Sequence, residues 1–171
     1  MTAQNPALAV RRLLAALSLL LAGWAQAAAG PDALFAATLH DLEQRAVALE
    51  KYRGKPLIVN FWARWCGPCR VEIPELAKLH EKYQMRGLVV LGIGLEEQPD
   101  SARDFAKAYE MSYPVLLGDN RKTLWLMQTL GNARGGLPFT VVIDRGGQIV
   151  SRKLGLMTAA DLEAAAQALL K

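Results

Sequence analysis

The sequence has few of the residues that cross-link small domains or bind metal ions. Its 171 residues include only two cysteines and two histidines. Two cysteines exclude a disulfide-rich scaffold and a four-cysteine zinc site, and they place every thiol of the chain at Cys66 and Cys69. His40 and His80 have no metal-ligand spacing relative to that pair, so we expect no metal site and interpret both histidines as surface residues.

A strong excess of charge of one sign is also lacking. Twenty Lys and Arg stand against sixteen Asp and Glu, and 52% of the residues are hydrophobic. This balance excludes a disordered acidic chain and predicts a packed core. If Arg11 and Arg12 are removed on maturation, eighteen basic residues face sixteen acidic ones, a net charge of +2 that predicts no nucleic-acid partner. The length fits one domain with a short appendage.

That appendage has the pattern of an export signal. The first twelve residues contain no acid and end in Arg11-Arg12, and Leu13 to Ala22 follow with Ser18 as the one polar residue. Ala25-Gln26-Ala27 then supplies a small-residue cleavage motif. We predict a signal peptide over residues 1–29 and a single domain over residues 30–171.

An uncleaved membrane anchor is the alternative, because residues 13–29 are 17 mostly apolar positions, at the lower limit for a spanning helix. Either way the domain lies outside the cytoplasm, in the periplasm or another extracytoplasmic space. Membrane contact is expected only through this segment, if it stays attached to the inner membrane.

Apolar runs and helical periodicity alternate through the rest of the chain. Leu57 to Trp62 is nearly all apolar, which predicts a central strand covered on both faces. Further strands are expected at 35–49 (two short edge strands), 88–93, 113–117, 139–143 and 148–154, and helices at 66–84, 101–109, 122–130 and 159–170. Asp100, Asp119 or Asn120, and Thr158 are expected to cap the last three helices. The pattern indicates an α/β fold with a mixed central sheet flanked by helices on both faces.

The two cysteines lie where the central strand gives way to a helix. A thiolate at the start of a helix meets unpaired N–H groups and the positive end of the helix dipole, which lower a thiol pKa from about 8.5. Cys66 is therefore the expected nucleophile, and Cys69, inside the first turn, is placed to attack it afterwards. Pro68 suits the first helical turn, and Gly67 adds no bulk beside the sulfur.

Structural roles for this pair are less favoured. One Cys-x-x-Cys motif supplies two ligands where structural zinc needs four. A disulfide closing so short a loop removes little chain entropy, so it stabilises a fold weakly. A redox role is the better interpretation.

The segment Phe61 to Arg70, FWARWCGPCR, with Pro74 five positions after Cys69, resembles the active-site segment of the thioredoxin family. Leu137-Pro138 before an apolar strand is similar to that family's cis-proline loop. An export signal and an additional strand and helix between about residues 88 and 117, before that loop, make the chain similar to the extracytoplasmic TlpA/ResA-type branch.

This resemblance implies a thioredoxin-like fold and a thiol–disulfide oxidoreductase without a cofactor. It implies a redox disulfide between Cys66 and Cys69, and a cis bond before Pro138 that leaves the Leu137 backbone open to pair with an extended substrate. Trp65, adjoining Cys66, is expected to rim the substrate site together with Gly67 and Pro68, while Trp62 belongs to the core.

One position departs from the cytoplasmic thioredoxins, which carry a buried Asp six residues before the first cysteine. Asn60 stands there, and an amide cannot act as a base. Glu72, one helical turn after Cys69, matches the C-x-x-C-x-x-E pattern of the extracytoplasmic branch. We hypothesise that Glu72 accepts the proton of Cys69; the alternative is a solvated carboxylate, as we also expect of Glu96-Glu97.

The resemblance and the Gly-Pro dipeptide favour a reductant of protein disulfides, with an antioxidant role as its wider consequence. An exported reductant needs an electron donor, and a membrane thiol shuttle of the DsbD or CcdA kind is implied by analogy. A net oxidant, a redox-sensitive binding or holdase module without turnover, and a thiol peroxidase are the alternatives. Against the last, Ala63 stands where the peroxidase pattern has Thr.

Overall fold

The computed structural model describes residues 30–171, so the predicted signal peptide or anchor lies outside the described residues. Within residues 30–171, no helix has the length and hydropathy needed to cross a membrane. The helices are α2 (Pro31–Phe35), α3 (Gly67–Tyr83), α4 (Pro99–Ala108), α5 (Asn120–Thr129) and α6 (Ala159–Leu169), with short 3-10 turns at Leu49–Tyr52 and Gln84–Arg86. The strands are β1 (Thr38–Asp41), β2 (Ala46–Ala48), β3 (Leu57–Trp62), β4 (Val89–Gly94), β5 (Val115–Leu117), β6 (Phe139–Ile143) and β7 (Ile149–Leu154).

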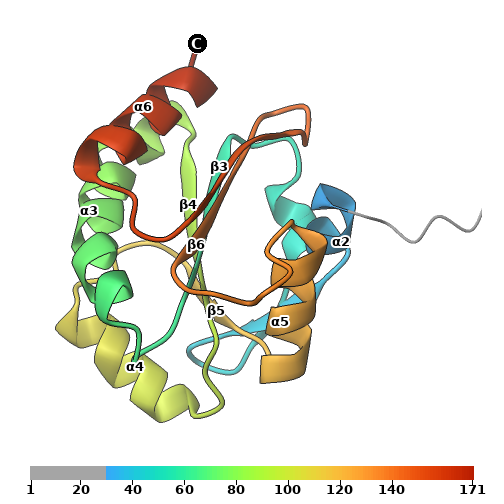
Figure 1. The fold of residues 1–171 in the computed structure, drawn as a ribbon, viewed down its shortest axis with the longest axis vertical. Coiled ribbons are helices and arrows are strands. Elements are labelled where there is room, and N and C mark those ends of the chain that lie inside the picture. The colour runs from blue at the N-terminus through green and yellow to red at the C-terminus, as the bar shows by residue number, and fades with distance from the viewer. Residues whose placement is uncertain (1–29) are drawn as a thin grey trace, which may run out of the picture.

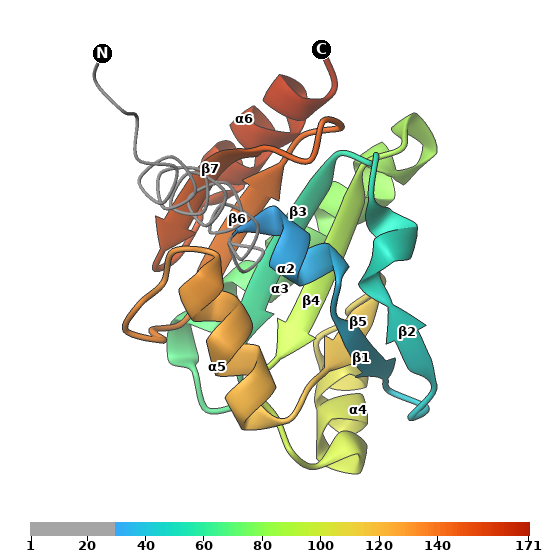
Figure 2. The same ribbon diagram turned by 90° about the vertical axis from the view of Figure 1, so that its right-hand side faces the viewer.

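The strands form one mixed sheet in the order β2-β1-β5-β4-β3-β6-β7. β3, β4 and β5 run parallel, whereas β6 is antiparallel to β3 and β7 is antiparallel to β6. Helices α3, α4 and α6 cover one face of the sheet, and α2 and α5 cover the other (Figures 1 and 2). The predicted fold class is confirmed, including the strand and helix that precede the proline loop.

Strand β3 is the centre of both cores because all six of its side chains are buried. Its side chains alternate between the faces, as a strand requires. Ile58 and Trp62 pack in the cluster under α3, α4 and α6, and Val59 and Phe61 pack in the cluster under α2 and α5. Asn60 points to the same face as Ile58 and Trp62, toward α3.

Several local expectations need correction. Helix α4 begins at Pro99 with Gln98 as N-cap, so Asp100 lies in the first turn and does not cap the helix. The α2 helix of five residues was not predicted, since it is too short to show a helical period. Of the two N-terminal strands only β2 lies at the edge, because β1 also pairs with β5. Asp119 and Thr158 do cap α5 and α6.

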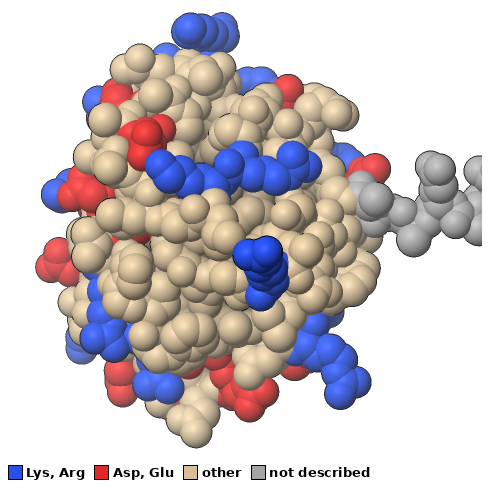
Figure 3. All heavy atoms as spheres, in the orientation of Figure 1, with Lys and Arg blue, Asp and Glu red and all other residues tan. Residues whose placement is uncertain are grey.

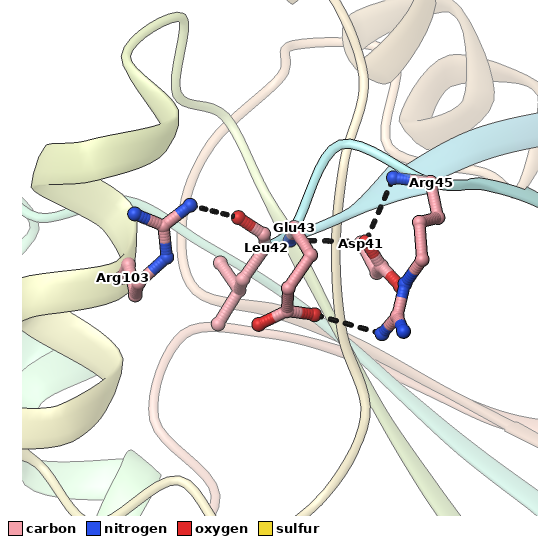
Figure 4. Close-up of polar contacts among 5 residues, drawn as sticks. All are labelled: Asp41, Leu42, Glu43, Arg45 and Arg103. Carbon is pink, nitrogen blue, oxygen red and sulfur yellow. Dashed lines mark hydrogen bonds and ion pairs between the residues drawn. The ribbon is translucent and has the colours of Figure 1, made fainter.

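Helix α4 is joined to the turn between β1 and β2 (Figure 4). Arg103 donates from Nη2 to the carbonyl oxygen of Leu42, at 2.5 Å. The turn is ordered by the Asp41 carboxylate, which accepts from the backbone N–H groups of Glu43 and Arg45 and from the Arg45 guanidinium. This bond therefore joins α4 to the turn between β1 and β2.

Candidate active site

The strand-to-helix junction places Cys66 at the N-terminus of α3. Cys66 has extended backbone angles and is the N-cap residue, and its Sγ accepts the backbone N–H of Cys69 at 3.3 Å. The sulfur thus occupies the position where a capping side chain neutralises the free N–H groups of a helix. Gly67 and Pro68 form the first two helical positions and both are exposed.

The two cysteines form a disulfide, with 5.3 Å between their Cα atoms, so the structure is that of the oxidised protein. Cys66 is 5% exposed and Cys69 is fully buried. Cys66 is therefore the less buried of the two cysteines. Beside it, the Trp65 side chain is 68% exposed, while Trp62 is buried as expected.

The loop between β3 and α3 is held at Arg64 from two sides. The Glu96 carboxylate accepts the Arg64 backbone N–H at 2.6 Å and the Arg64 Nε–H at 2.9 Å. The Arg64 carbonyl oxygen accepts from Nε of Arg70 at 2.9 Å and from its Nη2 at 2.5 Å. Since Trp65 and Cys66 follow directly, these bonds fix the backbone that presents them.

The loop that precedes β6 carries the predicted cis-proline. The Leu137–Pro138 bond is cis, Pro138 is buried and Leu137 is half-buried. Phe139 pairs with Phe61, so the proline lies beside the end of β3 that leads to Cys66. The Pro138 carbonyl oxygen accepts from Gly155 N–H, whereas within residues 30–171 the backbone N–H and C=O of Leu137 carry no hydrogen bond.

Asn132 braces this loop from within. Its side-chain amide is buried, donates to the Gly136 carbonyl oxygen at 2.7 Å and accepts the Gly136 N–H at 3.3 Å. Gly135 has a φ of 66° and Gly136 packs so closely on Leu154 that a Cβ would lie 3.0 Å from Cδ1. The amide and the two glycines set the path of the chain into the cis bond.

Glu72 is fully buried in the core beneath the disulfide. Its Oε1 accepts the Met157 backbone N–H at 3.2 Å and the Thr140 hydroxyl at 3.3 Å, and its Oε2 accepts Nδ2 of Asn60 at 3.2 Å. Asn60 Nδ2 also donates to the Thr140 hydroxyl oxygen at 2.9 Å. The solvated alternative for Glu72 is therefore wrong.

Burial raises the pKa of Glu72 to about 7, and the hydrogen bonds from Met157, Thr140 and Asn60 oppose that shift. Lys153 on β7 opposes it more weakly. A carboxyl group with a pKa near neutrality can take up and release a proton at ordinary pH, as a general base requires. The hydrogen bonds that Glu72 accepts from the Thr140 hydroxyl and the Met157 backbone N–H were not predicted from the sequence.

Two other expectations are wrong. Glu96 is 7% exposed and paired with Arg64, not solvated. His80 is half-buried with a buried Nδ1, and burial lowers the pKa of its imidazole; His40 is exposed as expected. Among residues 30–171 no three His, Cys, Asp or Glu side chains are grouped so that they could hold a metal ion.

Comparison with known proteins identifies the family of this chain. The family model described as AhpC/TSA matches residues 31–152. The chain belongs to the AhpC/TSA family. A curated relative, the thiol-disulfide oxidoreductase ResA of Geobacillus thermodenitrificans, is 33% identical over 127 residues, which are 73% of this chain and 69% of the relative. ResA of Bacillus cereus is 30% identical over 123 residues, 72% of this chain and 68% of the relative.

Solved structures agree with this family member in fold. A structure described as a DsbE-type thiol:disulfide interchange protein of Chlorobium tepidum has a TM-score of 0.69 at 26% identity, covering 79% of this chain and 93% of the other. A secreted thiol-disulfide isomerase of Corynebacterium glutamicum has a TM-score of 0.70 at 26% identity, covering 78% and 83%. With its vicinal cysteine pair, this AhpC/TSA family member is a thioredoxin-like thiol–disulfide oxidoreductase.

The hydrogen bonds from Arg64 to the Glu96 carboxylate, called the Arg64 clamp below, can be tested by substitution. Replacing Glu96 with Ala leaves the Arg64 N–H without its acceptor, which costs about 1–3 kcal/mol when such a group is shielded from water. We expect that loss in the free energy of unfolding in urea, together with faster hydrogen exchange at the Arg64 amide.

Two controls separate the contributions. Glu97→Ala removes the exposed neighbouring carboxylate, and Arg64→Ala removes the ion pair but keeps the backbone bond to Glu96. Glu97→Ala should cost less than about 1 kcal/mol because Glu97 is exposed. Arg64→Ala should cost more than Glu97→Ala, because it leaves the buried Glu96 carboxylate without its guanidinium partner. Equal losses in Glu96→Ala and Glu97→Ala would show that the clamp contributes nothing.

Proposed function

We propose that the protein reduces disulfide bonds in other proteins outside the cytoplasm, with Cys66 and Cys69 as its dithiol and Glu72 as the proton acceptor. The observation that carries this proposal is the buried Glu72 carboxyl, one helical turn from the fully buried Cys69 and with a pKa near neutrality. A buried thiol has no water to take its proton, so a neighbouring base is needed before it can attack.

The first step belongs to Cys66. In the reduced protein its thiolate, at the start of α3, attacks one sulfur of a substrate disulfide, and the other substrate sulfur leaves as a thiolate. A mixed disulfide then joins Cys66 to the substrate. The N–H of Cys69, which points at Sγ of Cys66, and the helix dipole favour the ionised sulfur.

The second step belongs to Cys69. Its thiol gives its proton to the Glu72 carboxylate, and the resulting thiolate attacks Sγ of Cys66. The mixed disulfide breaks, its electron pair leaves on the substrate sulfur, and the Cys66–Cys69 bridge forms. The substrate has gained two electrons and the protein is oxidised, as in the present structure.

Substrate binding is assigned to the rim of this site. The backbone of Leu137, before cis-Pro138, has no hydrogen-bond partner in the described part of the chain and can pair with an extended substrate segment by strand-type hydrogen bonds. Exposed Trp65, Gly67 and Pro68 supply an apolar border. In the view of Figure 3, Lys and Arg side chains form a band across the upper centre and a further group near the middle, while most acidic side chains lie toward the periphery.

The export pattern of residues 1–29 supports a location in the periplasm or an equivalent space. There the reduced state must be renewed, and we propose a membrane dithiol carrier of the DsbD or CcdA type as the source of the two electrons. The description of a related solved structure as a secreted protein is consistent with this location.

Substrate trapping tests the proposed activity. Cys69→Ser cannot resolve a mixed disulfide, so the reduced variant should remain covalently bound to a disulfide-containing protein such as insulin, while wild type releases it reduced. Non-reducing electrophoresis and mass spectrometry measure the adduct. Cys66→Ser, which lacks the nucleophile, is the control. Absence of an adduct with Cys69→Ser, or insulin reduction by Cys66→Ser, would refute the two-step assignment.

The pH dependence tests Glu72. In wild type the rate at which the mixed disulfide resolves should rise with pH through about 7, because only the ionised carboxylate accepts a proton. In Glu72→Gln that rise should disappear and the step should be at least about tenfold slower at neutral pH. Stopped-flow kinetics of a preformed mixed disulfide measures it. Glu75→Gln, the same change at a carboxylate paired with Lys78 on the same helix, is the control.

The pH dependence of the free energy of unfolding gives an independent check of the raised pKa of Glu72. Because the folded pKa of Glu72 is raised, the ionised form opposes folding above pH 7. Relative to wild type, Glu72→Gln should therefore become more stable as the pH rises from about 4.5 to about 7 and keep that gain at higher pH, by up to about 3 kcal/mol in the oxidised protein. A constant difference between the two proteins would contradict the raised pKa.

A further inference from the structure

One buried polar atom in the Glu72 network has no partner. Within the described chain, Oδ1 of Asn60 is fully buried and accepts no hydrogen bond. Its Nδ2, on the same amide, donates twice, to Glu72 Oε2 at 3.2 Å and to the Thr140 hydroxyl oxygen at 2.9 Å. A buried acceptor without a donor costs free energy and is rare in folded proteins.

The bonds around Glu72 suit only its ionised form. Three donors, Asn60 Nδ2, the Thr140 hydroxyl and the Met157 N–H, point at its two oxygens. A protonated carboxyl carries one O–H donor of its own, and that donor needs an acceptor. In the orientation observed, Asn60 directs an N–H group at Oε2 of Glu72. If Oε2 were protonated, its O–H group would point at that N–H group, and no hydrogen bond could form between the two donors.

A half-turn of the Asn60 amide removes this conflict. The oxygen and nitrogen of an amide are nearly the same size, so exchanging them needs no additional room. After the exchange Oδ1, which has two lone pairs, can accept the Glu72 O–H and the Thr140 O–H together, while Oε1 of Glu72 keeps the Met157 N–H. In the observed orientation Nδ2 makes two hydrogen bonds and Oδ1 makes none. In the reversed orientation Oδ1 would make two and Nδ2 would make none.

The position of Asn60 supports such a local change. Asn60 lies directly opposite Thr140 in the β3–β6 ladder, so both side chains stand on one face of the sheet against α3. Three other titratable or charged groups face Glu72 from the elements around it. Lys153 on β7 lowers the pKa of Glu72, Tyr113 ahead of β5 is itself affected by the Glu72 charge, and Cys69, one turn earlier on α3, is in the disulfide. Tyr113 stays neutral because burial, with the Glu72 charge, raises its pKa.

We propose that Asn60 is a positioning residue whose side-chain amide reverses each time Glu72 gains or loses its proton, donating from Nδ2 to the carboxylate and accepting at Oδ1 from the neutral acid. The inference rests on the proposed role of Glu72 as proton acceptor. It explains why an amide suits this position, because an amide can both donate and accept hydrogen bonds. An ionised carboxylate there could accept hydrogen bonds but not donate them, and an apolar side chain could do neither.

The test uses the oxidised protein, in which neither cysteine titrates. Nuclear magnetic resonance follows the two Nδ2 protons of Asn60 and their Overhauser contacts to the Thr140 side chain, while the Glu72 carboxyl carbon reports its own ionisation. Above the Glu72 pKa the contacts should be present. Below it they should be lost, with a midpoint that coincides with the carboxyl titration.

Glu72→Gln supplies the matched variant, because its side-chain amide donates where the neutral acid would donate. In this variant Asn60 should hold the reversed orientation at every pH, with the contacts to Thr140 absent throughout. Contacts that persist unchanged through the Glu72 titration, or in Glu72→Gln, would overturn the proposal. Circular dichroism confirms that the variant is folded, and the wild-type titration needs no substitution.

The failure of this inference is distinguishable from failure of the proposed function. If Glu72 titrates near neutrality and the amide does not reverse, Asn60 loses its role and the base assignment stands. If the amide reverses but the resolving step in Glu72→Gln keeps the wild-type rate and pH profile, Glu72 is not the proton acceptor and the two-state amide remains.

Discussion

The chemistry of this protein depends on one junction, the point where buried β3 ends and α3 begins. The Sγ of Cys66 is held at the free N–H groups of the helix, and the backbone of the preceding loop is fixed by Glu96 and Arg70. The strand cannot shift relative to the helix because all six β3 side chains are packed between two cores. A rigid scaffold of this kind keeps the sulfur in the field of the helix whatever substrate binds.

Beneath the junction, a small polar network lies in an apolar core. Such groups destabilise a fold unless each finds a partner, so the site is restricted to the residues that can supply them. The β3–β6 register provides two of them by placing Asn60 opposite Thr140, and the chain before α6 provides a third in the Met157 amide. The network leaves Glu72 with a pKa near neutrality, close to what proton transfer from a buried thiol requires.

The fold class and the position of the cysteines follow from local sequence patterns. The apolar run of β3, the helical period of α3 and the capping residues Asp119 and Thr158 act over a few positions, so the fold class and the place of the cysteines could be predicted from them. The C-x-x-C-x-x-E spacing likewise pointed to Glu72.

Burial by distant segments could not be predicted in this way. Glu96 lies 32 residues from the Arg64 that it binds, and Thr140 is 68 residues from Glu72. Both look like ordinary polar residues in sequence, because their partners are brought to them only by the order of strands in the sheet. The partial burial of His80 could not be predicted for the same reason, since its ring packs against Tyr113 from a different part of the chain.

The most direct test of the account is a titration of the Cys66 sulfur in a reduced Cys69→Ala variant, which carries no other thiol. The rate of alkylation by iodoacetamide, measured against pH, reports the thiolate fraction. The account predicts ionisation well below the value of about 8.5 that is typical of a free cysteine, and alkylation at neutral pH correspondingly faster than that of an unstructured thiol. Ionisation at the free-cysteine value, with no faster alkylation, would contradict it.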